Sequence, residues 1–323
     1  EPSAEERRAR TDDDGVTLWR DNAFGTLEQD AFRRDFTVNA LYFNPLDKGN
    51  LIDLVDGLPD LQNGIVRAIG DPAYRLEEDP VRLLRALKLV GQYSFELDDA
   101  LKKVLGRKVP EVERASSARL FEELLKILGG SKALPIITAF HDFGLLPHFW
   151  PQLEAEWKKP IGKMVRALLA ERDKRIAAGG YSTSKALAVA TVTLPAVIAR
   201  LADPKLKRLW SDYYPGIGSD CSQAIRDFMS PFPVSRFFTA RAREMILMLP
   251  RFYEGKRIEK VSAHPEYKYG HALFALLLHV QGWNRELLAK WPPPPSRQNA
   301  GKRGGRKGRR SRKRRSSNRQ TDK

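Results

Sequence analysis

The first quarter of the chain places short apolar runs between turn-forming residues, and its pattern predicts a few small elements. Thr26 begins a capping-box pattern that predicts a helix over residues 27–33. Two runs rich in β-forming residues, 36–43 and 51–55, flank a segment of turn composition and predict a hairpin. Residues 65–69 are a third strand candidate.

Beyond this region the pattern changes to a helical one. From about Pro80 to Lys290 apolar residues recur every three or four positions, and Gly and Pro interrupt them at intervals, which predicts a series of helices. Three strands make a poor sheet, because each face needs cover and each edge needs a partner. We therefore expect more strands before Glu1 and interpret the sequence as a fragment: an α/β N-terminal remnant followed by all-α segments.

The net charge of +16 is concentrated at the C-terminal end. After the prolines of 292–295, residues 297–323 hold thirteen Lys and Arg against the single acid Asp322, which accounts for +12. This composition cannot bury a core and predicts a disordered tail. The tail is either a solubilising end or a salt-sensitive contact for nucleic-acid phosphates that reads no sequence. Its RNA-binding candidates are Lys302, Arg303, Arg306, Lys307, Arg309, Arg310, Arg312, Lys313, Arg314 and Arg315.

The cysteine content and the hydropathy of the sequence indicate the cellular compartment in which we expect the protein. The single cysteine, Cys221, excludes an internal disulfide and a cysteine-based metal cage, which fits a reducing environment. No apolar run approaches the length that spans a bilayer, and no secretion signal opens the sequence. We expect a cytoplasmic monomer without a membrane span.

Two polar motifs carry the candidate chemistry. The first places Arg34, Asp35 and Asn39 around the start of a predicted strand, where charged and amide groups can reach ribose and phosphate. Taken alone, such a cluster is usually a surface ion-pair group.

The second motif opens a predicted helix. Asp79 has the N-cap position and Pro80 the first helical position, and Arg82 and Arg85 are three residues apart on one side. A carboxylate beside a guanidinium can accept and donate along one base edge. The alternative is a capping aspartate with a paired arginine, but the occurrence of both motifs in one chain favours a nucleotide site.

In four segments the sequence resembles the class II nucleotidyltransferases, which comprise bacterial poly(A) polymerase and the CCA-adding tRNA nucleotidyltransferases. Residues 33–40 resemble the family's sugar and phosphate motif, 53–57 with Asp60 its flexible linking motif, 78–82 its base-reading motif, and 119–124 its last neck motif. The resemblance implies nucleotide-binding roles for Arg33, Arg34, Asp35, Asn39, Asp79, Arg82 and Arg85. It implies neck or structural roles for Asp53, Asp56, Gly57, Asp60, Glu78, Arg119 and Glu123.

The resemblance also implies a domain order. Residues 1–70 would be a remnant of the nucleotidyltransferase head, and 71–130 a helical neck with the base-reading motif. Residues 131–290 would form a helical RNA-binding body, and 291–323 the proline spacer and basic tail.

The catalytic centre of the family has no counterpart here. In the family, Asp-x-Asp after a glycine-containing turn and a further carboxylate hold Mg²⁺ for attack on the α-phosphate of ATP. The acidic cluster at 12–14 lies in a Gly- and Arg-containing loop and is better interpreted as a solvated loop. We therefore expect no catalytic or metal-binding residue in this chain, and expect it to bind nucleotide without catalysis.

Residues 18–28 and the arginine-rich C-terminus resemble the poly(A) polymerase branch. This implies polyadenylation: AMP transfer from ATP to an RNA 3′ end with release of pyrophosphate. The alternatives are a CCA-adding or A-adding tRNA nucleotidyltransferase, or a helical RNA-binding protein without catalysis. Body cations that could follow RNA are Arg166, Arg200, Lys205, Lys207, Arg208, Arg236, Arg241 and Arg243.

Overall fold

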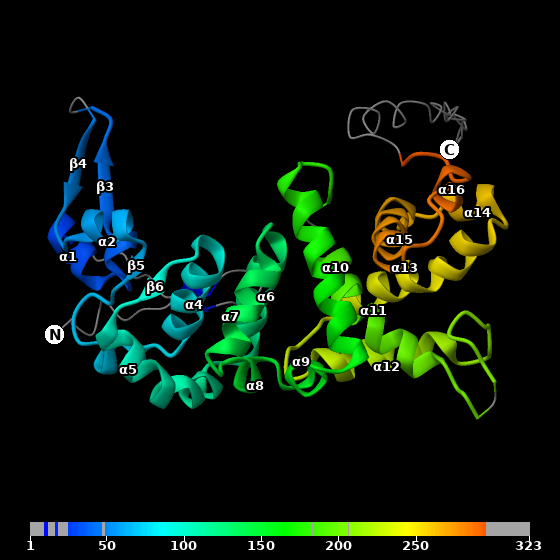
Figure 1. Cartoon of the computed structure of the whole chain (residues 1–323), viewed down its shortest axis with the longest axis horizontal. Coiled ribbons are helices and arrows are strands. Elements are labelled where there is room, and N and C mark those ends of the chain that lie inside the picture. The colour runs from blue at the N-terminus through cyan, green and yellow to red at the C-terminus, as the bar shows by residue number, and fades with distance from the viewer. Residues whose placement is uncertain are drawn as a thin grey trace, which may run out of the picture.

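The computed structural model describes residues 25–46, 49–182, 184–205 and 207–294, together with the backbone of two short strands, β1 (Arg10–Thr11) and β2 (Thr17–Leu18). The molecule is elongated, and its elements follow one another along the long axis in nearly the order of the sequence (Figure 1). We call the described residues before 71 the head segment, 71–130 the neck and 131–290 the body. The acidic cluster at 12–14 and the basic tail lie outside the described residues.

The predicted hairpin is present, although it begins later than expected. Strand β3 (Leu41–Asn44) pairs antiparallel with β4 (Asn50–Asp53), with Leu41 opposite Asp53. Residues 37–39 are not strand: they form a 3-10 turn, η1 (Thr37–Asn39). Side-chain hydrogen bonds from Thr37 to Asp60 and from Asn39 to Asp35 hold this turn, and such bonds compete with strand pairing.

The other predicted elements of the head segment are also found. Helix α1 (Leu27–Arg33) has the capping box, in which the Gln29 N–H donates to Thr26 Oγ1 and the Thr26 N–H donates to Gln29 Oε1. The third strand, β5 (Ile65–Val66), is shorter than predicted and pairs in parallel with β6 (Glu96–Leu97). The described strands therefore form three separate two-stranded sheets.

Besides α1 and η1, the helices of the head segment and neck are α2 (Gly57–Asn63), α3 (Pro72–Glu78), α4 (Val81–Tyr93), α5 (Asp99–Lys108), the 3-10 turn η2 (Val109–Arg114) and α6 (Ser117–Gly129). Those of the body are α7 (Ala133–Asp142), α8 (Leu146–Phe149), α9 (Pro151–Glu156), α10 (Pro160–Ala177), α11 (Lys185–Leu201), α12 (Ile217–Met229), α13 (Arg236–Glu254), α14 (Ile258–Ser262), α15 (Tyr267–Gln281) and α16 (Glu286–Ala289). The sequence pattern missed α2 and α3, because seven residues hold too few apolar positions to define a helical period.

Neck and body share one continuous core, and helix α11 lies at the centre of its body part. This helix is apolar around nearly its whole circumference and packs against α10, α12 and α13. Its buried hydroxyls at Thr191 and Thr193 donate to backbone carbonyls four residues earlier, at 2.8 Å each, and so need no other partner. Cys221 also lies in this core, where burial raises the pKa of its thiol to about 12.

The architecture is thus a small α/β N-terminal part followed by a helical neck and a helical body, as predicted. Among the helices of the described residues, none combines the length and apolarity needed to cross a bilayer.

Candidate nucleotide-binding site

The first polar motif forms one hydrogen-bonded unit at the end of α1. The Asp35 carboxylate accepts the Phe36 N–H and the Asn39 side-chain amide, each at 3.0 Å. The Arg34 guanidinium donates to the Asn39 carbonyl oxygen at 2.6 Å and lies 4.9 Å from the centre of the Tyr42 ring. Arg34, Asp35 and Asn39 are therefore fixed relative to one another before any ligand binds.

Asp30 anchors this unit to α1. Its carboxylate accepts the Tyr42 hydroxyl at 2.7 Å and pairs with Arg33 and, at 3.0 Å, with Arg34. The Tyr42 hydrogen bond, followed by that of Arg34, lowers the pKa of Asp30 from 3.8 to about 2. Arg33 is 73% exposed at its side chain, so of the two arginines Arg34 is held more firmly.

The depressed pKa of Asp30 predicts a pH dependence. Because the folded-state pKa is lower than the ordinary 3.8, the Asp30 contacts stabilise the fold fully above pH 3.8 and lose their effect as the pH falls toward 2. Asp30→Asn should therefore make stability less sensitive to pH in this range. Carbon NMR titration of the Asp30 carboxyl in the wild-type chain measures the pKa directly, and a value near 3.8 would contradict the assignment.

The second polar motif lies where α3 ends and α4 begins. Asp79 ends α3 as its C-cap, and Pro80 is the N-cap of α4, so our placement of these residues was one position too far into the helix. The displacement arises because α3, which the sequence pattern missed, already occupies the residues before Asp79. The Asp79 carboxylate nevertheless accepts the Val81 N–H, at 3.1 Å.

Each member of the predicted base-reading couple is held by a different partner. The Arg82 guanidinium donates to Glu78 Oε2 at 2.6 Å and to the Arg75 carbonyl oxygen at 2.7 Å, and its side chain is only 12% exposed. Asp79 Oδ2 accepts from Arg119 of α6 at 2.7 Å. Burial raises the pKa of Asp79, but the hydrogen bond and charge of Arg119 outweigh it, so the pKa is lowered and the carboxylate stays charged.

The two motifs meet at the boundary between head segment and neck. Arg85 of α4 pairs with Asp35 at 3.5 Å. Arg75 of α3 donates from one nitrogen to the carbonyl oxygens of both Arg33, at 2.9 Å, and Arg34. The structure therefore brings the sugar and phosphate motif against the helices that carry the base-reading motif.

Arg75 is the residue of this site that sequence reasoning missed. Its side chain is only 14% exposed, and it also pairs with Glu78 at 3.1 Å. The available signal was its spacing: Arg75, Glu78 and Arg82 follow one another at intervals of three and four residues, as neighbours on a helix surface do.

The linking motif supports the turn beneath this site. Asp53 accepts the N–H groups of Gly57, at 2.9 Å, and Leu58, at 2.8 Å, at the start of α2. Burial raises the pKa of Asp53, but these backbone donors outweigh it and lower the pKa. Asp56 has a left-handed backbone with φ of 57°. The buried Asp60 accepts the Thr37 hydroxyl at 2.7 Å, which ties α2 to η1.

Glu123 is the other neck residue that the motifs singled out. It is buried on α6 and accepts from Lys126 one turn later at 2.7 Å. It shares this helix with Arg119, so α6 contributes to the neck core and to the hold on Asp79.

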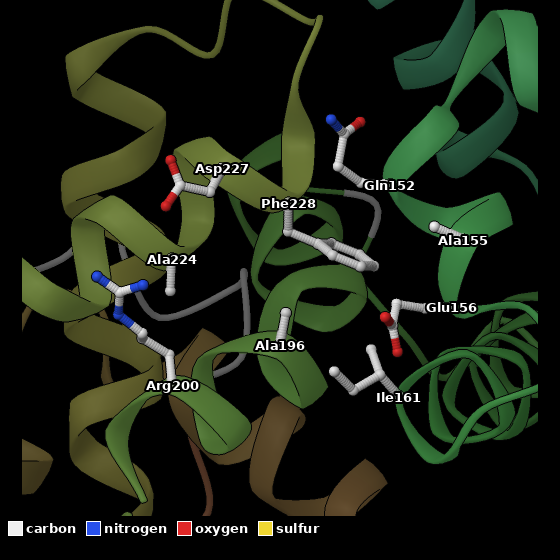
Figure 2. Close-up of a pocket in the computed structure, with 9 residues that line it drawn as sticks. All are labelled: Gln152, Ala155, Glu156, Ile161, Ala196, Arg200, Ala224, Asp227 and Phe228. Atoms are coloured by element: carbon white, nitrogen blue, oxygen red, sulfur yellow. The ribbon is translucent and has the colours of Figure 1, made fainter.

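A cavity of about 320 Å³ lies apart from these residues, in the body between α9, α10, α11 and α12. Figure 2 shows the Phe228 ring at its centre, with Ala196 and Ile161 beside it and Glu156 and Arg200 on opposite sides. It shares no residue with the motifs at the head and neck boundary.

The resemblance implies Mg²⁺, and the described residues do not fit such an ion. Within residues 25–46, 49–182, 184–205 and 207–294, no three His, Cys, Asp or Glu side chains come together in a group that could hold a metal.

The geometry thus defines a class: a small α/β segment with a preorganised polar site, joined to a helical neck and body. Comparison with known proteins shows which proteins the chain resembles. Residues 3–67 match the family model of the poly(A) polymerase head domain, and residues 94–156 match that of a probable RNA- and SrmB-binding site of polymerase A.

Curated relatives extend the match over most of the chain. Poly(A) polymerase I of Haemophilus influenzae is 30% identical over 296 residues, covering 88% of this chain and 64% of the relative. Poly(A) polymerase I of Escherichia coli is 29% identical, covering 85% and 60%. A CCA-adding enzyme of Ligilactobacillus salivarius is 38% identical over 117 residues, covering 36% and 28%. The chain thus spans less than two thirds of the length of each of these relatives.

Solved structures agree on the fold. The Bacillus stearothermophilus CCA-adding enzyme in complex with CTP superposes with a TM-score of 0.55 at 20% identity, covering 82% of this chain and 59% of that one. A tRNA nucleotidyltransferase with a primer tRNA and an ATP analogue gives a TM-score of 0.51 at 24% identity, covering 82% and 71%. Over most of its length the chain is therefore similar to bacterial poly(A) polymerases, and over part of it to CCA-adding tRNA nucleotidyltransferases.

Proposed function

We propose that this chain supplies the nucleotide and RNA sites of an enzyme that adds AMP from ATP to RNA 3′ ends. Arg34, Asp35 and Asn39 would hold the sugar and phosphates of ATP, and Asp79 and Arg82 would select adenine. The helical body and the basic tail would hold the RNA. The matches to two poly(A) polymerases over most of the chain support polyadenylation as the reaction.

The observation that carries the proposal is the contact between the two polar motifs. The Asp35–Arg85 pair and the Arg75 hydrogen bonds hold the two motifs against each other, although some 40 residues of sequence separate them, which supports binding of one nucleotide by both. Asp79 is charged, and each carboxylate oxygen has a lone pair beyond its present hydrogen bond. It can therefore accept from the amino group of adenine, while the protein still holds it in place.

A CCA-adding or A-adding tRNA nucleotidyltransferase is the second candidate. The 38% identity to a CCA-adding enzyme over 117 residues favours it. The two candidates differ in nucleotide choice, because a CCA-adding enzyme must accept both CTP and ATP at one site, whereas a poly(A) polymerase needs only ATP.

One experiment tests the proposal. The protein expressed from the complete gene is incubated with each of the four nucleoside triphosphates, on unstructured RNA and on tRNA that lacks its CCA end. We expect long adenylate products on unstructured RNA from ATP. In the Asp79→Ala variant we expect the preference for ATP over CTP to fall roughly tenfold, which is the discrimination that a good base contact provides.

Arg119→Ala is the matched control for Asp79→Ala. It removes the same ion pair but leaves the carboxylate, so it should weaken the neck without relaxing nucleotide choice. Strict termination after CCA on tRNA would select the second candidate. RNA binding with no nucleotide binding at all would leave a non-catalytic RNA-binding protein. An unchanged ATP preference in Asp79→Ala would remove Asp79 from base reading.

A further inference from the structure

The structure divides the cationic body residues into those already occupied and those free to bind. Arg241 pairs with both oxygens of Glu266, at 2.7 and 3.0 Å. Arg208 lies over the Tyr214 ring at 4.0 Å and donates to a backbone carbonyl. These two arginines serve the fold, whereas Arg236 forms no side-chain hydrogen bond or ion pair with any described residue and is exposed.

Arg236 belongs to a pocket that the sequence did not reveal. Helices α12 and α13 pack against each other (Figure 1), and between them lies a cavity of about 300 Å³. Its polar lining consists of Arg226, Arg236, Arg243, Ser222 and Thr239. On α12 the lining residues are four positions apart, and on α13 they are three or four apart, so each helix turns one polar stripe toward the other.

The charges of this pocket are only partly balanced. Arg243 donates to Glu244 at 2.8 Å, and Arg226 donates to the neutral Gln223 at 2.6 Å. The nearby Asp227 accepts from Gln223 at 2.6 Å. Three guanidinium groups therefore face one cavity with one directly paired carboxylate, and like charges so arranged repel one another unless an anion lies between them.

The position of Arg236 strengthens this electrostatic argument. It is the first residue of α13, a helix of 19 residues with no acidic side chain in its first turn. The helix macrodipole makes this end partially positive, so a cation here is unfavourable without an anionic partner. The pocket hydroxyls already donate to backbone carbonyls, Ser222 to Gly218 and Thr239 to Ser235, so the guanidinium groups are the donors left for a ligand.

We propose that Arg226, Arg236 and Arg243 form a binding site for a backbone phosphate of single-stranded RNA. Guanidinium groups match phosphate oxygens in charge and in their paired hydrogen-bond geometry. The cavity volume is at the lower end of small-ligand sites, which suits one phosphate with its sugar. The site lies outside the regions that match the two family models, and its RNA assignment rests on the proposed function.

The test measures the affinity of the full chain for a labelled adenylate oligonucleotide over a range of salt concentrations. Arg236→Gln should lower the affinity roughly tenfold at low salt, the scale of lost charge-assisted hydrogen bonds. It should also reduce the slope of log affinity against log salt by about 0.7, as expected for one phosphate contact on a single strand. Arg236→Lys should retain the slope, because it retains the charge.

Arg251→Gln is the matched control, since this exposed arginine lies on the same helix outside the pocket. It should change the affinity less than twofold. An equal loss in this control, or wild-type affinity in Arg236→Gln, would overturn the proposal.

ATP binding is measured in parallel. Loss of ATP affinity in Arg236→Gln would assign the pocket to the phosphates of the free nucleotide and overturn the RNA site. If instead the proposed nucleotide site is wrong, the wild type and every variant should show no preference for ATP, while Arg236→Gln should still lower the affinity for RNA.

Discussion

Gly57→Ala should destabilise the head segment by about 3 kcal/mol, at the upper end of the usual cost of overpacking. A Cβ at this position would lie 2.2 Å from the Thr37 carbonyl oxygen and 2.9 Å from its carbon. Both are backbone atoms, so they cannot rotate away as a flexible side chain could. The methyl group would push α2 away from η1, the turn that carries Asn39.

Hydrogen exchange at the amides of α2 and η1, together with chemical denaturation, measures this effect. Gly106→Ala is the control, because it makes the same change in α5 at a position where a Cβ would meet nothing within 4 Å. That control should be stabilising by about 0.5 to 1 kcal/mol, since alanine favours helix over glycine. Equal exchange in Gly57→Ala and the wild type would show that the close approach of α2 and η1 is wrong.

Arg75→Gln should lower both stability and ATP affinity. The substitution removes the hydrogen bonds from a largely buried guanidinium to the carbonyl oxygens of Arg33 and Arg34 and its ion pair with Glu78. Hydrogen bonds of charged groups contribute about 1.5 to 3 kcal/mol, so we expect a loss of about 2 kcal/mol. Because these bonds hold the first motif against α3, ATP affinity should fall roughly tenfold if the proposed nucleotide site is correct.

Arg33→Gln is the control that shows whether loss of any arginine at this boundary lowers stability as much as loss of Arg75. It also removes one arginine at the same boundary, but this side chain is 73% exposed and pairs only with Asp30 among the described residues. Surface ion pairs contribute little, so the control should change stability by less than about 0.5 kcal/mol. Chemical denaturation of both variants measures the stability, and calorimetry of ATP binding to Arg75→Gln and to the wild type measures the affinity. The same ATP affinity in Arg75→Gln as in the wild type would mean that Arg75 does not position the site.

The local elements were predictable where short-range chemistry decides the backbone. The capping box of α1 and the β3–β4 hairpin both involve residues close together in sequence, and both are found. Local reasoning failed at residues 37–39, where the buried Asp60 of another element bonds Thr37 and competes with strand pairing. It also failed at Asp79, because the short helix α3 before it has no clear period.

The sequence by itself determined the resemblance to nucleotidyltransferases, the helical character of the body and the identity of both polar motifs, because these depend on residue type and local spacing. Only the tertiary structure decided which charges meet. It paired Asp35 with Arg85 and Asp79 with Arg119, and it placed Arg236 of α13 in one pocket with Arg226 of α12. The physical reason is that an ion pair depends on distance in space, and the packing of buried helix faces sets that distance for residues far apart in the chain.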